Sequence, residues 1–487
     1  MKKKPDFWDS RFTRVLEFIF DVVLIFGLLV LGLIIDHYIS TGTIVSLGWL
    51  YRTNSITIYI PIVYTIVYII FIRAYNISVT RKKYLNILPS LVLSSFFTNL
   101  SLVVVIIVQS VNNHIYFLGN AVSVAIIFAL QVLFMSLYKY LMSKLFNKYN
   151  KRIVLVYGPE NRMETFLMEF FLDKSHYNEI KYFVYFNPEE VLNDTIKECI
   201  NEVDDVYIAA GVSSEAKNII VNYILQKTYK NLYIVPRTYE IGIQKSAFDC
   251  LDDTLLFRQK TMHLSLEQRI IKRLFDVFFS VIILVLTFVP MLFVALIIKL
   301  QDRGPVFYKQ TRICRNNKEF KIYKFRSMKV ASDEKKLAER NDSRITKFGK
   351  FLRASRIDEL PQFINVLKGD MSIVGPRPLL PNIIEEAIKL NPEFANRANV
   401  KPGITGLSHV YGRYDTPDLE RLRFDLMYVR KYSLLLDLSI MLLTVKVMMS
   451  KTAGLGLYAD KSFKEILETK NIELIEMPFG GEFRYKN

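Results

Sequence analysis

Cysteine is scarce in this chain of 487 residues, which contains only Cys199, Cys250 and Cys314. Their scattered positions exclude a disulfide framework and the close spacing of a cysteine metal site. Such cysteine usage is typical of proteins in a reducing compartment. The sequence also lacks a basic surface motif interleaved with aromatic residues, so we expect no nucleic-acid partner.

Acidic residues are the other shortage, with 47 Asp and Glu against 64 Lys and Arg and a formal net charge of +17. A positive balance of this size suits anionic lipid headgroups or nucleotide phosphates. Half of the residues (51%) are hydrophobic, and they are gathered in long runs. The chain is long enough for two or three domains, and these runs predict that one of them lies in a membrane.

Four apolar runs fill the first 145 residues, at 15–35, 56–72, 85–108 and 117–137. Each is close to the length of about 20 residues that crosses a bilayer. No small-residue cleavage site follows the first run, so it predicts a span and not a signal peptide. Few polar residues lie within the runs apart from Glu17 and Asp21. Residues 1–146 are therefore expected to form a four-helix transmembrane anchor without a conduction path.

Basic residues outside the runs predict the orientation of this unit. They precede the first run, separate the second from the third and follow the fourth: Lys2, Lys3, Lys4, Arg11, Arg14, Arg73, Arg81, Lys82, Lys83, Lys139, Lys144, Lys148, Lys151 and Arg152. The other two loops hold little positive charge beyond Arg52. The positive-inside rule therefore predicts that both ends of the unit lie in the cytoplasm.

Strand and helix patterns alternate between residues 147 and 260. Strand candidates lie at 152–158, 182–186, 203–211 and 231–237, with helical patterns at 165–172 and 214–227 between them. This order predicts a doubly wound α/β domain. A dinucleotide site needs several glycines after the first strand, but the turn here, GPENRM, contains only Gly158. We expect a degenerate Rossmann-like domain with a regulatory or packing role.

A fifth apolar run, at residues 274–300, has positive charge at both ends. Lys272 and Arg273 precede the run, Lys299 lies at its end, and Arg303 follows it. Pro290 lies deep inside the run. Proline removes a backbone donor and favours a kink. A helix that enters the membrane, bends and returns to the same face satisfies both features. The charge pattern alone leaves a fifth full span open.

Residues 351–378, FLRASRIDELPQFINVLKGDMSIVGPRP, carry the strongest chemical signal. Asp358 and Glu359 are expected near the start of a helix, because Pro361 suits a first helical turn. A helix N-terminus and nearby arginines stabilise anions and keep carboxylates ionised. Neighbouring carboxylates on a helix point in different directions, so one can attack phosphorus while the other holds Mg²⁺. The competing interpretation is a capped helix without chemistry.

Basic residues around the pair are candidates for phosphate binding. Residues 304–329 are expected to form two short strands across a turn at 316–318, with basic side chains on the outward face. The turn GPRP holds its arginine between prolines, and the glycine turn KPGITG occupies residues 401–406. The candidates are Arg312, Lys324, Arg326, Arg353, Arg377 and Lys401. The competing interpretations are a cationic face against anionic lipid and purely structural turns.

Six ordered segments together resemble the bacterial polyprenyl-phosphate sugar-1-phosphate transferases: DRGPVFYKQ (302–310), YKFRSM (323–328), IDELPQ (357–362), NVLKGDMS (365–372), VGPRP (374–378) and KPGITG (401–406). The resemblance covers about residues 268–451, and longer members of the family also have four N-terminal spans and a degenerate α/β domain. It implies a multi-domain membrane protein in which residues 261–451 form a re-entrant helix and an α+β catalytic domain. A C-terminal tail would follow at 452–487.

In this family a UDP-sugar donates its sugar 1-phosphate to undecaprenyl phosphate, UMP is released, and capsule, exopolysaccharide or O-antigen synthesis begins. The resemblance implies that Asp358 is the nucleophile of a covalent phosphosugar–enzyme intermediate and that Glu359 binds Mg²⁺. It also implies phosphate binding by Arg353 and Arg377, and a catalytic domain on the cytoplasmic face of the bacterial cytoplasmic membrane. The family's GWAQV is GLSHV at 406–410 here, which leaves the sugar open. The sequence is compatible with a homo-oligomer.

Two other functions stay open from the sequence. A non-catalytic membrane scaffold of polysaccharide assembly would have no need of the acidic pair with Arg377. A membrane glycosyltransferase that works without a covalent intermediate would need no nucleophilic carboxylate beside a metal ligand.

Overall fold

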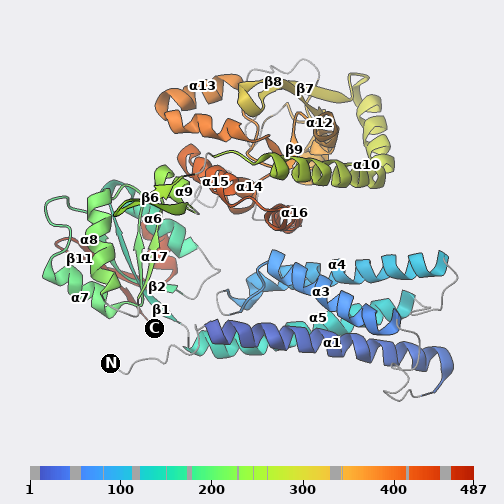
Figure 1. The fold of residues 1–487 in the computed structure, drawn as a ribbon, viewed down its shortest axis with the longest axis horizontal. Helices are drawn as coiled ribbons and strands as arrows, with labels where there is room; N and C mark the ends of the chain where they lie inside the picture. Colours follow the sequence, from blue (N-terminus) through green and yellow to red (C-terminus); the bar gives the residue numbers. More distant parts are fainter. Residues whose placement is uncertain are drawn as a thin grey trace. The chain divides into compact units, whose positions relative to one another are not determined.

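The computed structural model (Figure 1) describes residues 11–43, 56–79, 82–111, 121–149, 151–172, 178–226, 230–244, 246–259, 262–329, 342, 344–412, 416–449 and 462–486. The chain forms two compact units, Met1–Val235 with Leu457–Asn487, and Pro236–Gly456. Five basic residues used for the predicted orientation lie outside the described residues, namely Lys2, Lys3, Lys4, Arg52 and Arg81.

Four long helices form a bundle in the first unit: α1 (Arg11–Thr41), α3 (Ile56–Ala74), α4 (Tyr84–Val111) and α5 (Ala121–Tyr149). Helices α1 and α4 each pack against both α3 and α5. Within α1, α4 and α5, stretches of 21 to 24 residues are long and apolar enough to cross a membrane, whereas α3 contributes a shorter apolar stretch, Pro61–Ala74. Large apolar side chains such as Phe20, Val23 and Leu133 are exposed on the outside of the bundle. These features support a membrane protein.

The interior of the bundle is more polar than the sequence predicts. Lys139 on α5 is fully buried, and its Nζ lies 2.8 Å from a carboxylate oxygen of Glu17 and 2.8 Å from one of Asp21, both on α1. Nearby, Gln131 Oε1 accepts a hydrogen bond of 2.8 Å from the Tyr64 hydroxyl. Counting Lys139 among the loop charges was therefore wrong, because it is a partner for carboxylates inside the bundle. The cytoplasmic orientation stays a prediction.

A six-stranded sheet in the order β11-β12-β2-β1-β3-β4 forms the other part of the first unit. Its parallel strands match the four predicted strands: β1 (Arg152–Gly158), β2 (Asn178–Tyr185), β3 (Asp205–Ile208) and β4 (Asn231–Ile234). Alternate residues of β1 pack on opposite faces. Leu155 contributes to a core with α7 (Asp194–Glu202) and α8 (Ser214–Leu225), and Val156 contributes to one with α6 (Glu160–Leu172). The predicted α/β character is thus present.

The sheet is completed by the C-terminal end of the chain, for which the sequence predicts a separate tail. Helix α17 (Phe463–Thr469) packs against the sheet, β11 (Ile472–Met477) pairs with β12 (Gly480–Tyr485), and β12 runs antiparallel to β2. Conversely, the compact unit ends at Val235, before the predicted boundary at 260. Helix α9 (Thr238–Ile243) and the hairpin of β5 (Ala247–Leu251) and β6 (Thr254–Arg258) belong to the second unit.

Helix α10 (Leu266–Asp302), in the second unit, contains the predicted fifth apolar run and Pro290. A straight helix of this length would measure about 55 Å, but Figure 1 shows that α10 is bent. Its first arm packs through Phe279 on the main core of this unit, and its second arm packs through Val294 on Phe325 and Leu352. Most of its other apolar side chains are exposed. Both arms therefore contact the same unit.

Short strands and helices complete the second unit, in keeping with the α+β expectation. They are β7 (Phe307–Ile313), η2 (Arg315–Asn317), β8 (Glu319–Phe325), α11 (Lys347–Ala354), η3 (Ile357–Glu359), α12 (Gln362–Lys368), β9 (Ser372–Val374), α13 (Pro381–Leu390), η4 (Pro392–Asn399), β10 (Gly403–Thr405), α14 (Leu407–Tyr411), α15 (Asp418–Lys431) and α16 (Leu434–Met449). The predicted hairpin at 304–329 is present as the antiparallel pair β7–β8. The core of this unit includes Ile322 from β8, Phe363 and Val366 from α12, and Ile440 from α16.

Candidate active site

The acidic pair lies in η3, a single 3-10 turn between α11 and α12. Arg356, just before it, adopts a left-handed backbone conformation (φ 57°), which is uncommon for a residue other than glycine. Pro361 then precedes the first turn of α12. The pair is thus held on a tight turn before a helix, close to the predicted arrangement. A strained backbone of this kind is frequent at functional sites.

Glu359 is surrounded by cations. Lys324 Nζ, from β8, lies 2.7 Å from Glu359 Oε1, and Arg356 Nη1 lies 3.9 Å from the same oxygen. Burial on its own would raise the pKa of this carboxyl, but Lys324, Arg377 and Arg356 together outweigh it and lower the pKa to about 2. Glu359 is therefore a carboxylate at any physiological pH.

Asp358 has a different environment from its neighbour. Its side chain is buried, and among the described residues Oδ1 has no hydrogen-bond partner. Burial and the adjacent Glu359 charge raise its pKa to about 6, against the opposing effect of Lys324 and Arg353. A buried polar atom without a partner is costly in a folded protein, so it often marks a functional group. Two adjacent carboxyls with pKa values pushed apart suit two different roles.

Arginines complete the electropositive surroundings. Arg353 Nε donates to Ser327 Oγ at 2.9 Å, and Arg312 Nη2 donates to Gln310 Oε1 at 2.6 Å. Burial and the neighbouring Arg377 charge lower the pKa of Arg312 to about 10. Guanidinium groups that crowd one another in this way favour an anion between them.

Arg326 follows β8 and is half-buried, and its backbone N–H donates to Val306 O at 3.0 Å. The structure therefore gathers Arg312, Lys324 and Arg353 near the pair, and places Arg326 in the adjoining segment.

The turn GPRP (375–378) is joined by backbone hydrogen bonds to the turn KPGITG (401–406). Strand β9 pairs in parallel with β10, Gly403 N donates to Pro376 O at 2.9 Å, and Gly375 N donates to Thr405 O at 2.8 Å. A Cβ at Gly375 would lie 2.4 Å from Lys401 O, so the close approach requires glycine. The amide of Gly403 is thus used within the protein, and the joined turns hold Arg377 in place.

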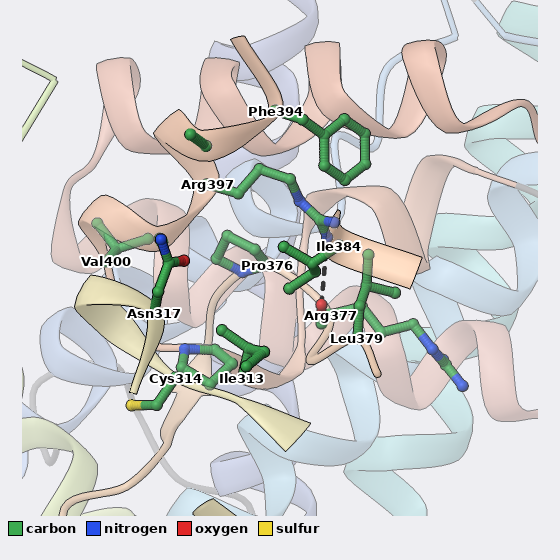
Figure 2. Close-up of a pocket in the computed structure, with 13 residues that line it drawn as sticks. Ile313, Cys314, Asn317, Pro376, Arg377, Leu379, Ile384, Phe394, Arg397 and Val400 are labelled. Atoms are coloured by element: carbon green, nitrogen blue, oxygen red, sulfur yellow. Dashed lines mark hydrogen bonds between the residues drawn. The ribbon is translucent and has the colours of Figure 1, made fainter. Parts of the chain in front are cut away.

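A small cavity of about 30 Å³ lies behind these turns. Figure 2 shows that the Arg377 side chain points away from the other residues that line it, while Arg397 Nη2 donates to Arg377 O at 3.1 Å. Arg397 is itself held by Asp425, with Nε and Oδ2 2.7 Å apart. Because the lining is largely apolar and the volume suits about one water molecule, this cavity supports the turn and is too small for a donor substrate.

His409 is a residue that the sequence singled out only as a departure from the GWAQV motif. Its Nδ1 is enclosed and has no hydrogen-bond partner among the described residues. Burial and the charge of Arg377 lower its pKa to about 3, against the effect of Glu359. A neutral imidazole therefore lies near the charges of Arg377 and Glu359.

Lys401 is the predicted phosphate-binding residue that lies elsewhere. It lines a larger cavity with Arg273, Arg315 and Asp276, and these groups, not the acidic pair, influence its pKa. The charges that act on the pair come from Lys324, Arg353, Arg356 and Arg377.

No group of three or more His, Cys, Asp or Glu side chains with the geometry of a metal site occurs in the described part of the chain. Mg²⁺, however, is commonly bound by one or two carboxylates together with substrate phosphates. The ionised Glu359 and the partnerless Oδ1 of Asp358 fit such an ion.

The region that contains the acidic pair is similar to known proteins. Residues 267–451 match the family model described as bacterial sugar transferase. The chain is 36% identical over 314 residues to a protein named UDP-glucose:undecaprenyl-phosphate glucose-1-phosphate transferase from Escherichia coli (strain K12), covering 61% of this chain and 68% of the relative. A Klebsiella pneumoniae protein of the same name is 38% identical over 270 residues, covering 53% and 58%.

A third relative carries the name of a different sugar. The protein named Galactosyl transferase CpsE from Streptococcus agalactiae serotype III is 40% identical over 199 residues, which cover 38% of this chain and 43% of the relative. The chain belongs to the bacterial sugar transferases, the family of polyprenyl-phosphate sugar-1-phosphate transferases that its motifs resemble.

Proposed function

We propose that this protein transfers a sugar 1-phosphate from a UDP-sugar to undecaprenyl phosphate, which gives undecaprenyl-diphosphate-sugar and UMP, as the first membrane step in the synthesis of a surface polysaccharide. The observation that carries the proposal is the pairing of a buried Asp358, whose Oδ1 has no hydrogen-bond partner among the described residues, with an ionised Glu359 among cations. The names of the relatives support the donor class and the lipid acceptor.

The reaction proceeds in two displacements at one phosphorus atom. A carboxylate oxygen of Asp358 attacks the phosphorus that carries the sugar, the bond to the UMP oxygen breaks, and UMP leaves with the electron pair. A phosphate oxygen of undecaprenyl phosphate then attacks the same phosphorus and releases the Asp358 carboxylate. Arg353 and Arg377 orient the phosphates and stabilise charge as it develops. The covalent step allows UMP to leave before the lipid acceptor arrives.

Glu359 is the residue that would hold Mg²⁺, together with oxygens of the donor phosphates. When bound, the ion would neutralise charge on the diphosphate. Lys324 keeps the Glu359 side chain oriented through its 2.7 Å contact. In the absence of substrate this contact also satisfies a buried carboxylate, which would otherwise be costly.

The membrane geometry follows from α10. Both of its arms contact the second unit, and apolar side chains are exposed along it. We therefore propose that α10 enters the membrane, bends near Pro290 and returns to the cytoplasmic face. The site would then lie at headgroup level, where a soluble donor can meet a lipid phosphate.

We expect Lys324→Met to lower kcat/KM for UMP release by about 100-fold, because a positive group that contacts the pair is lost. The measurement is steady-state UMP release with purified protein. Lys309→Met is the matched control, since the Lys309 Nζ on the same hairpin lies 5.5 Å from the centroid of the Tyr323 ring and does not contact Glu359. Equal kcat/KM values for the Lys324 variant and the control would contradict this role.

The reaction as a whole is tested by UMP release from a panel of UDP-sugars with Mg²⁺ and undecaprenyl phosphate. We expect UMP with at least one donor, in turnover amounts only when the lipid phosphate is present, and the donor that works identifies the sugar. Folded protein that releases no UMP from UDP-glucose, UDP-galactose or the UDP-N-acetylhexosamines would contradict the proposal and favour a non-catalytic scaffold.

A further inference from the structure

A cavity of about 430 Å³ lies in the second unit beside the beginning of α10. It is formed by α10, by the turn at η2 and by the segment between η4 and β10, and its lining includes Ile270, Leu274, Arg269, Arg273, Arg315 and Lys401. Ligand sites commonly occupy about 300–1,000 Å³. The cavity is therefore large enough for a small ligand or a lipid headgroup.

The charges in this cavity are strongly unbalanced. Among the described residues, five cationic side chains line it, against the single carboxylate of Asp276. Asp276 already accepts hydrogen bonds from Ser372 Oγ (2.8 Å) and Ile373 N (3.1 Å). Lys272 is neutralised by Asp437, 2.6 Å away.

The other four cations are Arg269, Arg273, Arg315 and Lys401, and none of them forms an ion pair with a described carboxylate. A partly enclosed group of unpaired cations is electrostatically unfavourable without an anion.

Two of these cations meet around Gly369 at the end of α12. A Cβ at this glycine (φ 93°) would lie 3.5 Å from Lys401 Nζ and 3.7 Å from Arg273 Nη2. Burial and the Arg273 charge lower the pKa of Lys401. Arg273 also donates to the carbonyl oxygens of Val366 and Leu367, so its position is fixed. An anion seated between Arg273 and Lys401 would relieve their repulsion.

The rim of the cavity is apolar on the side of α10. Ile270 and Leu274 are 53% and 67% exposed, and the exposed apolar surface continues along the helix through Phe278 and Val281. In a helix that enters a membrane, this surface faces lipid. The unpaired cations therefore lie next to the point where the lipid headgroups begin, so the anion that reaches them most readily carries an acyl or polyprenyl chain.

This cavity is separate from the acidic pair. The pair precedes α12, whereas Arg273 and Lys401 gather at its other end, and the seven residues of α12 span about 10 Å. Arg273, Arg315 and Lys401 are also absent from the groups that shift the pKa values of Asp358 and Glu359.

We infer that this cavity binds the phosphate headgroup of an anionic membrane lipid, held by Arg273, Arg315 and Lys401 with its chains along the rim at Ile270 and Leu274. The inference rests on the cavity and on the proposed insertion of α10 into the membrane, and not on the proposed reaction. A lipid in this position would hold the beginning of α10 at the headgroup level beside the active site.

The test is native mass spectrometry of the full-length protein in a non-ionic detergent, titrated with phosphatidylglycerol. Arg315→Gln/Lys401→Gln is expected to weaken lipid binding by about tenfold or more, since a charge-assisted hydrogen bond is worth at least that factor. Arg315→Lys/Lys401→Arg keeps both charges and should bind within about threefold of the unmodified protein. Lys389→Gln removes one charge from the exposed face of α13 and should bind like the unmodified protein.

Three results would overturn the inference. The first is equal phosphatidylglycerol binding by the neutralised double variant when circular dichroism shows that it is folded. The second is equally tight binding of zwitterionic phosphatidylcholine, which would mean that the chains alone are recognised. The third is displacement of the lipid by inorganic phosphate at concentrations equal to that of the lipid, which would identify a site for soluble phosphate.

Discussion

Asp358→Asn is expected to abolish turnover, with a loss of at least about a thousandfold in kcat, while the protein stays folded in the membrane. The amide cannot act as the nucleophile, and loss of a nucleophile removes most of the catalytic effect of such a site. The fold should tolerate the change, because Asp358 Oδ1 has no described partner and burial, which raises the pKa of the carboxyl to about 6, makes a neutral side chain less costly at this position. The measurement is UMP release, together with the thermal unfolding midpoint.

The control for this substitution is Asp418→Asn, at the exposed beginning of α15, which should release UMP at the rate of the unmodified protein. Appreciable turnover by a well-folded Asp358→Asn protein would sink the assignment of the nucleophile. A protein that fails to fold would instead show a lowered unfolding midpoint, so the two outcomes can be told apart.

The second large effect concerns the bundle. Lys139→Met should lower the free energy of unfolding by about 3 kcal/mol or more, because it leaves Glu17 and Asp21 buried without their cation. Thermal unfolding in detergent is the measurement. Lys144→Met, five residues further along α5 and exposed, should change the midpoint little.

A triple variant separates charge from packing. Lys139→Met combined with Glu17→Gln and Asp21→Asn removes all three charges, so it should recover much of the lost stability. If Lys139→Met unfolds at the same temperature as the unmodified protein, the ion triad does not hold α5 against α1. If the triple variant is no more stable than Lys139→Met, the loss comes from packing and not from the unpaired carboxylates.

Local patterns in the sequence were sufficient for much of the fold. The parallel strands β1 to β3 are largely buried apolar runs, whereas β4 is mostly exposed at the edge of the sheet. The β7–β8 hairpin follows from alternation across an asparagine turn. The pairing of strands that are far apart in the sequence could not be predicted. Strand β12 joins β2 from almost 300 residues away, and nothing in residues 462–486 taken alone shows which sheet edge it will meet.

The bundle shows a similar limit for charge. Positive residues near apolar runs normally indicate cytoplasmic loops, and Lys139 follows the fourth run closely enough to be read in that way. Only the packing of α5 against α1 shows that Lys139 faces Glu17 and Asp21. Glu17 and Asp21 lie in the first apolar run, and carboxylates inside a membrane normally have a cationic partner. Their presence could therefore have indicated a buried lysine or arginine on another helix of the bundle.

For the site, the motifs identified the pair but not its electrostatics. The contact between Lys324 and Glu359 joins residues 35 positions apart, and the different pKa values of Asp358 and Glu359 depend on burial. Lys401 shows that a residue whose motif lies beside the site can still point away from it. Its motif lies beside that of Arg377 through the β9–β10 pairing, yet its side chain extends into the second cavity. Adjacent backbones do not determine where long side chains go.

The central claim is that sugar phosphate is carried on Asp358, and a single turnover without acceptor tests it most directly. Purified protein is mixed with Mg²⁺ and a UDP-sugar that supports turnover, in the absence of undecaprenyl phosphate, and is then quenched and analysed by mass spectrometry. We predict about one UMP released per active protein and a sugar-phosphate mass increment on the peptide that contains Asp358. No UMP and no increment until the lipid phosphate is added would contradict the covalent mechanism and would indicate direct transfer between the two substrates.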